Sequence, residues 1–249
     1  MFFIMRSQAK TVNRCILASL LIWSIAAYVQ NVNYSWGQMT SAAGSPAVVE
    51  FGQLGSVSIK ASRRANDFPT MIFTDARGGV LLTTAVGAGN RIFRINPEEN
   101  RDGRENPILR FSVVDGPATK SKVVFAAAMY GGGSDCEYQG TVIGATNGHL
   151  RPLLLDQAFT NAEGGMYLGD LGENRGYGFA VWNFIWGSEA HVDPHHYNVK
   201  LFRFDPIAGQ MVKIADLKTT RSYKTDTEAL SEFGLHYPNL LRSIPDFGC

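Results

Sequence analysis

The stretch Lys122–Tyr130 (KVVFAAAMY) decides the fold of this 249-residue chain. Every position inside it is apolar, so an extended conformation would bury both of its faces. Such a run suits the central strand of a sheet, and a buried helical segment is the alternative. Gly131–Gly133 follow at once, and they favour a strand that ends at a loop. We therefore predict that Lys122–Tyr130 is a central β-strand.

Other short apolar runs, separated by Gly, Asn, Asp and Pro, are typical of further strands. Ile108–Val114 alternates apolar and polar residues, as a half-buried strand does. Asn147-Gly148 supplies the positive φ angles of a tight hairpin turn between two such runs. The remaining predicted strands are Val57–Lys60, Thr70–Thr74, Val80–Val86, Arg91–Ile95, Thr141–Ala145, His149–Leu155, Met166–Gly169, Tyr177–Trp186, Tyr197–Phe204 and Gln210–Ala215.

One helix is predicted, near the C-terminal end. Thr225 and Glu228 match a capping box, an apolar stripe follows them, and Gly234 closes the segment. The whole pattern predicts a mainly β fold of propeller-like or sandwich-like antiparallel sheets with a short C-terminal helix. A signal or anchor helix is expected to precede it.

The N-terminal segment predicts export. Arg6, Lys10 and Arg14 precede the apolar run Cys15–Val29, which is shorter than the roughly 20 residues that span a bilayer. Small residues before position 27 predict cleavage after Ala26, and an uncleaved signal anchor is the alternative. We expect a leader over 1–26, a spacer over 27–45 and one β-rich domain over 46–249. Whether the leader is cleaved or stays as an anchor, the β-rich domain is expected in the periplasm or outside the cell.

Two cysteines, Cys136 and Cys249, remain after such cleavage. In an oxidising compartment they either form a disulfide or stay as two independent thiols.

The stretch Gly165–Asn174, followed by the apolar residues Phe179–Val181, resembles a degenerate FG-GAP or VCBS-type repeat. In that family the repeat builds a β-propeller blade whose loop often holds calcium; here Asp170 would take the first ligand position and Asn174 the fifth, and the resemblance implies a propeller-like scaffold without the metal. Gly172 and Gly178 stand where two further oxygen donors belong, so calcium binding is expected to be poor. Members of the family serve mainly as adhesion and binding surfaces.

The segment His191–His196 contains a dense cluster of side chains that can bind a metal ion. It places His191, Asp193, His195 and His196 within six residues, and imidazole and carboxylate groups both suit zinc. Its order matches neither the HExxH helix nor the HxHxDH loop of metallo-hydrolases. A polar loop between two strands is therefore favoured over a zinc site.

Aromatic residues concentrate in Tyr177–Trp186. Strand alternation puts Trp182 and Trp186 on one face, and they are the candidate contacts for a sugar or a peptide. Burial in the core is the commoner role for such residues and is the favoured alternative.

Composition and leader together predict an exported, non-catalytic binding or envelope-associated protein, whose partner is a protein or a carbohydrate. Lys+Arg 23 against Asp+Glu 22 gives no basic field, so nucleic-acid binding is not expected. Membrane contact is expected only through an uncleaved N-terminal segment. The alternative function is a secreted metal-dependent hydrolase that uses His191–His196. No cofactor is expected under the first prediction; zinc would accompany the second, and calcium would belong to the loop at Asp170 and Asn174.

Overall fold

A computed structural model describes residues 36–38, 47–62, 70–85, 108–118, 121–130, 137–154, 158–161, 163–190 and 192–243. The chain divides into two units, Met1–Asn33 and Tyr34–Cys249, and all the described residues belong to the second. The predicted leader, Cys136 and Cys249 lie outside the described residues. Within the described ranges, no helix is both long enough and apolar enough to span a bilayer.

The described residues form three antiparallel sheets, so the predicted mainly β class is confirmed. In this part of the chain the strands make neither a closed barrel nor a propeller. The strands are β1 Trp36–Gln38, β2 Ala47–Glu50, β3 Ser56–Ser62, β4 Thr70–Thr74, β5 Val80–Ala85, β6 Ile108–Asp115, β7 Lys122–Tyr130, β8 Glu137–Thr146, β9 His149–Pro152, β10 Ala158–Asn161, β11 Gly165–Asp170, β12 Tyr177–Ile185, β13 His196–Asp205 and β14 Gln210–Lys218. The described helices are α1 Asp226–Ser231 and the 3-10 turns η1 Gly52–Leu54 and η4 Leu240–Ser243.

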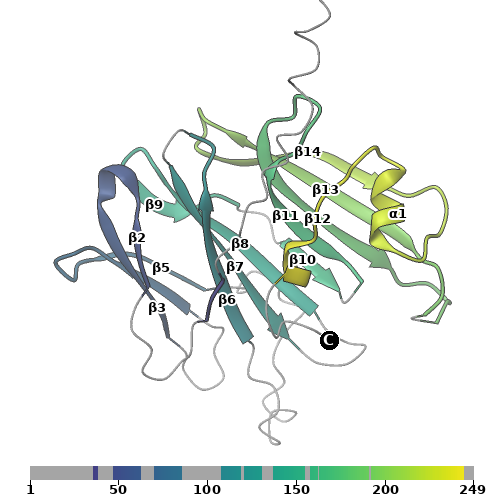
Figure 1. The fold of residues 1–249 in the computed structure, drawn as a ribbon, viewed down its shortest axis with the longest axis horizontal. Coiled ribbons are helices and arrows are strands. Elements are labelled where there is room, and N and C mark those ends of the chain that lie inside the picture. Colours follow the sequence, from purple (N-terminus) through teal and green to yellow (C-terminus); the bar gives the residue numbers. More distant parts are fainter. Residues whose placement is uncertain are drawn as a thin grey trace, which may run out of the picture. The chain divides into compact units, whose positions relative to one another are not determined.

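We name the three sheets by their place in the sequence. The N-terminal sheet has the order β2-β3-β4-β5, and the C-terminal sheet has the order β11-β12-β13-β14. The middle sheet has the order β1-β6-β7-β8-β10, with β9 also paired to β8. The two outer sheets are therefore simple meanders of consecutive strands. Figure 1 shows the teal middle strands between the blue and green ones.

Predicted and observed strands agree closely in several places and differ in others. The predictions for β4 and β7 match in both bounds, and β12 ends one residue earlier than predicted. β1 lies inside the range 27–45 that was expected to be a spacer, and β2 and β10 have no counterpart among the predicted strands. The predicted strand Arg91–Ile95 lies outside the described residues.

Strand β7 is buried on both faces because it has an outer sheet on each side. Val123, Phe125 and Ala127 contact the core shared with the C-terminal sheet. Val124 and Ala126 belong to the core shared with the N-terminal sheet. None of these five side chains is more than 2% exposed. The prediction of a central strand is confirmed.

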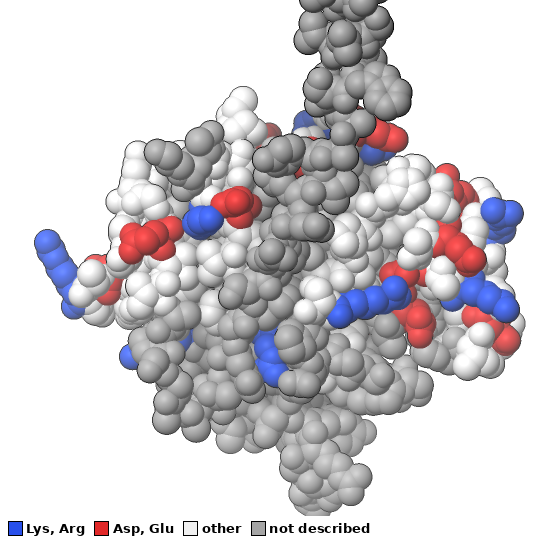
Figure 2. Space-filling model, viewed as in Figure 1, with Lys and Arg blue, Asp and Glu red and all other residues white. Residues whose placement is uncertain are grey.

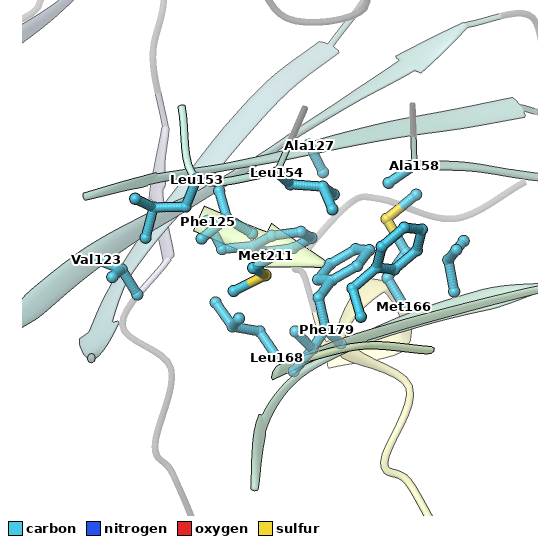
Figure 3. Packing of buried hydrophobic residues seen from close by; sticks show 14 of the residues in the cluster. Val123, Phe125, Ala127, Leu153, Leu154, Ala158, Met166, Leu168, Phe179 and Met211 are labelled. Atoms are coloured by element: carbon cyan, nitrogen blue, oxygen red, sulfur yellow. The ribbon is translucent and has the colours of Figure 1, made fainter. Parts of the chain in front are cut away.

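The core between the middle and C-terminal sheets is built from bulky side chains of both. Figure 3 shows Phe125 of β7 and Phe179 of β12 in this core, together with Leu153 and Met211. The rings of Phe125 and Phe179 are 6.0 Å apart and tilted by 40°, a favourable aromatic geometry. Other buried members of this core are Val114, Val123, Ala127, Tyr138, Val142, Leu154, Ala158, Met166, Leu168, Val181, Phe202, Leu240 and Leu241.

A tight corner carries the chain from the middle sheet into the C-terminal sheet. The Thr160 hydroxyl donates to the Trp182 carbonyl at 2.6 Å, and the Asn161 amide donates to Asn183 Oδ1 at 2.9 Å. Gly164 lies at this corner, where a Cβ atom would overlap Thr160 Oγ1. The close approach of β10 to β12 therefore requires glycine here.

The outer face of the C-terminal sheet is covered by α1 and the segment after it. Thr225 caps the helix by accepting a hydrogen bond from the Glu228 amide at 3.2 Å, as the capping box predicts. Gly234 follows with a φ of 68°, which suits the end of a helix. Buried residues in this layer are Leu171, Ala180, Trp182, Phe184, Tyr197, Val199, Leu201, Tyr223, Ala229, Leu230 and Leu235.

The predicted hairpin is also confirmed. Asn147 and Gly148 have φ angles of 52° and 76°, and they join β8 to β9. Two positive φ angles in a two-residue turn match the twist of the flanking strands.

Phe125→Ala tests whether the sheets depend on the core beneath β7. We expect a loss of about 3–5 kcal/mol in the free energy of unfolding, because the fully buried ring leaves a cavity. Val80→Ala is the control, since Val80 is 65% exposed on β5, and a change within about 0.5 kcal/mol is expected. Urea denaturation measures both, and equal losses would contradict this account of the core.

Candidate functional site

The two candidate tryptophans have different surroundings, although they share one face of the C-terminal sheet. Trp182 is 0% exposed, and its indole N–H donates to Asp226 Oδ2 at 3.0 Å. Trp186 follows the last residue of β12 and is 53% exposed. A ligand at the surface therefore has access to Trp186 and to no face of the Trp182 ring.

Trp182 instead belongs to a buried joint that fixes the C-terminal cover. Asp226, the first residue of α1, is 2% exposed. Its Oδ1 atom accepts from Arg242 at 3.0 Å, while Oδ2 accepts from Trp182. The carboxylate thus satisfies both oxygens and links β12, α1 and η4. Removing one member would leave a buried polar group without its partner, which is costly.

Trp186 rests on a rigid base of two rings. Its centroid lies 4.6 Å from that of Phe184 at 72°, and 5.8 Å from that of His195 at 73°. Phe184 and His195 themselves pack at 4.5 Å. The His195 backbone exchanges two hydrogen bonds with Tyr223, of 2.9 and 2.8 Å, so the base is tied to the cover layer. Trp186 is consequently exposed but held in place.

The loop after Trp186 is closed by Ala190 and Asp193. The Ala190 amide donates to Asp193 Oδ2 at 2.9 Å, and the Asp193 amide donates to the Ala190 carbonyl at 2.9 Å. Val192 within this turn is 87% exposed. We call the described residues 186–190 and 192–194 the Trp186 loop.

The histidine cluster does not converge in the described part of the chain. His195 and His196 are consecutive residues entering β13, so their side chains point to opposite faces of the sheet. His195 packs against rings, whereas His196 Nδ1 lies 3.1 Å from the Thr219 carbonyl. Asp193 is engaged by Ala190, and His191 lies outside the described residues. Among the residues described, no three His, Cys, Asp or Glu side chains are placed to hold a metal ion.

The loop after Asp170 is a tight turn between β11 and β12. Asp170 Oδ1 accepts from the Gly172 amide at 2.9 Å, and the Leu171 amide donates to the Gly176 carbonyl at 2.9 Å. Asn174 has a φ of 62°, which this turn uses to reverse direction. The two predicted calcium ligands, Asp170 and Asn174, therefore serve the turn, and calcium binding there stays a prediction.

A series of hydrogen bonds that the sequence did not predict lies next to Phe184 and His195, the two rings that form the base of Trp186. Arg221 Nε donates to the Tyr223 hydroxyl at 2.7 Å, and that hydroxyl donates to Glu232 Oε2 at 2.8 Å. The Thr220 amide donates to Glu232 Oε1 at 2.8 Å. The hydrogen bond from Thr220, followed by that from Tyr223, lowers the pKa of the Glu232 carboxyl.

Burial is the main cause of the raised pKa values of the tyrosines. It raises the pKa of Tyr197 and also that of Tyr237, the latter to about 12. Tyr237 stacks on Tyr167 with centroids 4.7 Å apart, and its hydroxyl donates to the Leu171 carbonyl at 2.7 Å. These tyrosines stay protonated at neutral pH and have structural partners.

No protein-family model, curated protein or solved structure matches this chain. The resemblance to FG-GAP and VCBS repeats therefore stays a prediction.

Glu232→Gln tests this series of hydrogen bonds through its pH dependence. The lowered pKa means that ionised Glu232 stabilises the fold above its unfolded-state value near 4.5, and that this contribution is lost as pH falls through the folded pKa. We expect the variant to be less stable than the parent at pH 7 and the difference to shrink in acid. Urea denaturation at several pH values measures this, and a constant difference would contradict it.

Measurement of bound zinc tests whether the histidines of residues 191–196 form a metal site. We expect no stoichiometric zinc on the purified protein, and no change in bound zinc in His196→Gln, because the described candidate ligands point apart. Metal analysis after dialysis provides the measurement. One zinc per chain, lost in that variant, would support the hydrolase alternative.

Proposed function

We propose that this chain is an exported, non-catalytic binding protein and that its ligand contacts the Trp186 loop. The observation that carries the proposal is the 53% exposure of Trp186 on its base of Phe184 and His195. An aromatic ring that is already immobilised loses little conformational entropy on binding, and tryptophan is enriched where binding energy is concentrated.

A binding role also agrees with the scaffold. The middle sheet shares one core with the C-terminal sheet and a second core with the N-terminal sheet. This stacking of sheets supports the sandwich-like form of the predicted fold. Ligand contact at a loop on such a rigid frame is common in β-rich binding proteins. The suggested relation to FG-GAP and VCBS repeats favours the same role by analogy.

The non-catalytic part of the proposal rests on how the polar groups are used. Asp226 is bonded to Trp182 and Arg242, and Glu232 is bonded to Tyr223 and the Thr220 amide. Each of these carboxylates supports the fold through both oxygens. This structural use of both carboxylates supports a non-catalytic role.

Export can be tested by fractionation. We expect the globular part outside the cytoplasm and a mature chain that begins at Ala27, because Arg6, Lys10 and Arg14 precede an apolar run that is short for a membrane span. N-terminal sequencing and immunoblots of cell fractions give the result. A full-length product confined to the cytosol would contradict export.

Binding can be tested with a panel of probes and two variants. Trp186→Ala removes the exposed ring, and Ile207→Ala removes a residue that is 94% exposed in the β13–β14 turn. The probes are peptidoglycan, chitin, cellulose, and immobilised arginine-rich and glutamate-rich polypeptides. We expect at least one probe to retain the parent and Ile207→Ala equally and to bind Trp186→Ala about tenfold less. Binding by none, or equal binding by all three proteins, would contradict the proposal.

A further inference from the structure

The chain segment that carries Trp186 lacks lysine and arginine, and Arg221, next to the Trp186 base, is bonded to the Tyr223 hydroxyl. The sequence contains neither Lys nor Arg from Gly176 to Val199, which covers β12 and the whole Trp186 loop. Over the face drawn in Figure 2, basic and acidic side chains of the described residues are interspersed. The charges that the loop does carry are the exposed carboxylates of Glu189 and Asp193.

The Glu189 carboxylate lies close to Gly187. A Cβ atom added to Gly187 would lie 3.0 Å from Glu189 Cδ and 3.3 Å from Oε1, so this carboxylate lies over the Gly187 backbone. Gly187 is the residue directly after Trp186. Within the described part of the chain, Glu189 forms no ion pair. Its charge therefore lies against the residue that follows the exposed Trp186.

An aromatic ring next to a carboxylate favours a cationic ligand. The ring attracts a cation through its quadrupole, and the carboxylate adds Coulomb attraction and a hydrogen-bond acceptor. Guanidinium groups suit both at once, because they stack on rings and donate to carboxylates. Val192, at 87% exposure, adds apolar surface to the same loop. An anionic lipid surface would be repelled by Glu189 and Asp193.

Building on the proposed function, we propose that the Trp186 loop binds a basic protein segment through an arginine side chain seated between Trp186 and Glu189. An apolar side chain of the same segment then contacts Val192. The partner is thus a cationic, amphipathic peptide stretch, and a neutral sugar is the competing occupant.

The experiment measures fluorescence anisotropy of a labelled peptide of alternating Arg and Leu, added to the full-length protein. Two companion peptides carry citrulline or Glu in place of Arg. We expect binding of the Arg peptide to weaken with rising salt, and binding of both companions to be at least about tenfold weaker.

Three variants locate the contact. Trp186→Ala and Glu189→Gln are each expected to weaken binding of the Arg peptide, by about tenfold and several-fold, respectively. Gly187→Ala keeps every charge but displaces the Glu189 carboxylate, and it is expected to resemble Glu189→Gln. Glu228→Gln, which removes an exposed acid from α1, is the matched control and should bind like the parent.

Full-strength binding by Glu189→Gln, or binding of the Glu peptide as strong as that of the Arg peptide, would overturn the inference. Loss in the Glu228→Gln control to the same extent would overturn it as well. If peptidoglycan, chitin or cellulose binds in a Trp186-dependent way while the Arg peptide does not, this inference fails and the proposed function stands. If no probe shows binding that depends on Trp186, both fail.

Discussion

Burial of both faces of β7 is the constraint on which the other layers depend. Val123 to Ala128 alternate between two cores, and each core needs a separate sheet to cover it. Small side chains make this possible. Ala126 and Ala127 let the sheets approach each other. Gly140 of β8 leaves room for Met166 of the facing sheet, because a Cβ atom on Gly140 would lie 2.6 Å from the Met166 sulfur. Apolar burial on this scale is the main stabilising term of the unit.

The position of the candidate site depends on the cover layer that packs on the outer face of the C-terminal sheet. The cover formed by α1 and the segment after it is fastened to β12 and to η4 by the Trp182–Asp226–Arg242 joint. Trp186, four residues after Trp182 on the same side, lies beyond this cover and is exposed. The cover layer therefore buries Trp182, which has a structural role, and leaves Trp186, on the same side of the sheet, exposed to a ligand.

Local patterns explain what the sequence could predict. The two-sided apolar run of β7, the Asn147-Gly148 turn and the Thr225 cap each depend on neighbours within a few residues. Trp182 and Trp186 could not be told apart, because the Asp226 partner lies 44 residues further along the chain. The Arg221–Tyr223–Glu232 chain has no sequence motif. Divergence of His195 and His196 follows from strand alternation only once β13 is known to begin at His196 rather than at the predicted Tyr197.

Native-state hydrogen exchange of the β7 amides is the most direct measurement of the central claim. If both outer sheets depend on β7, the amides of Val123 to Ala128 exchange only through global unfolding, and their opening free energy equals that from denaturation. Exchange of these amides through a smaller opening, while β12 stays protected, would show that the C-terminal sheet holds its structure without the middle one and would contradict the account.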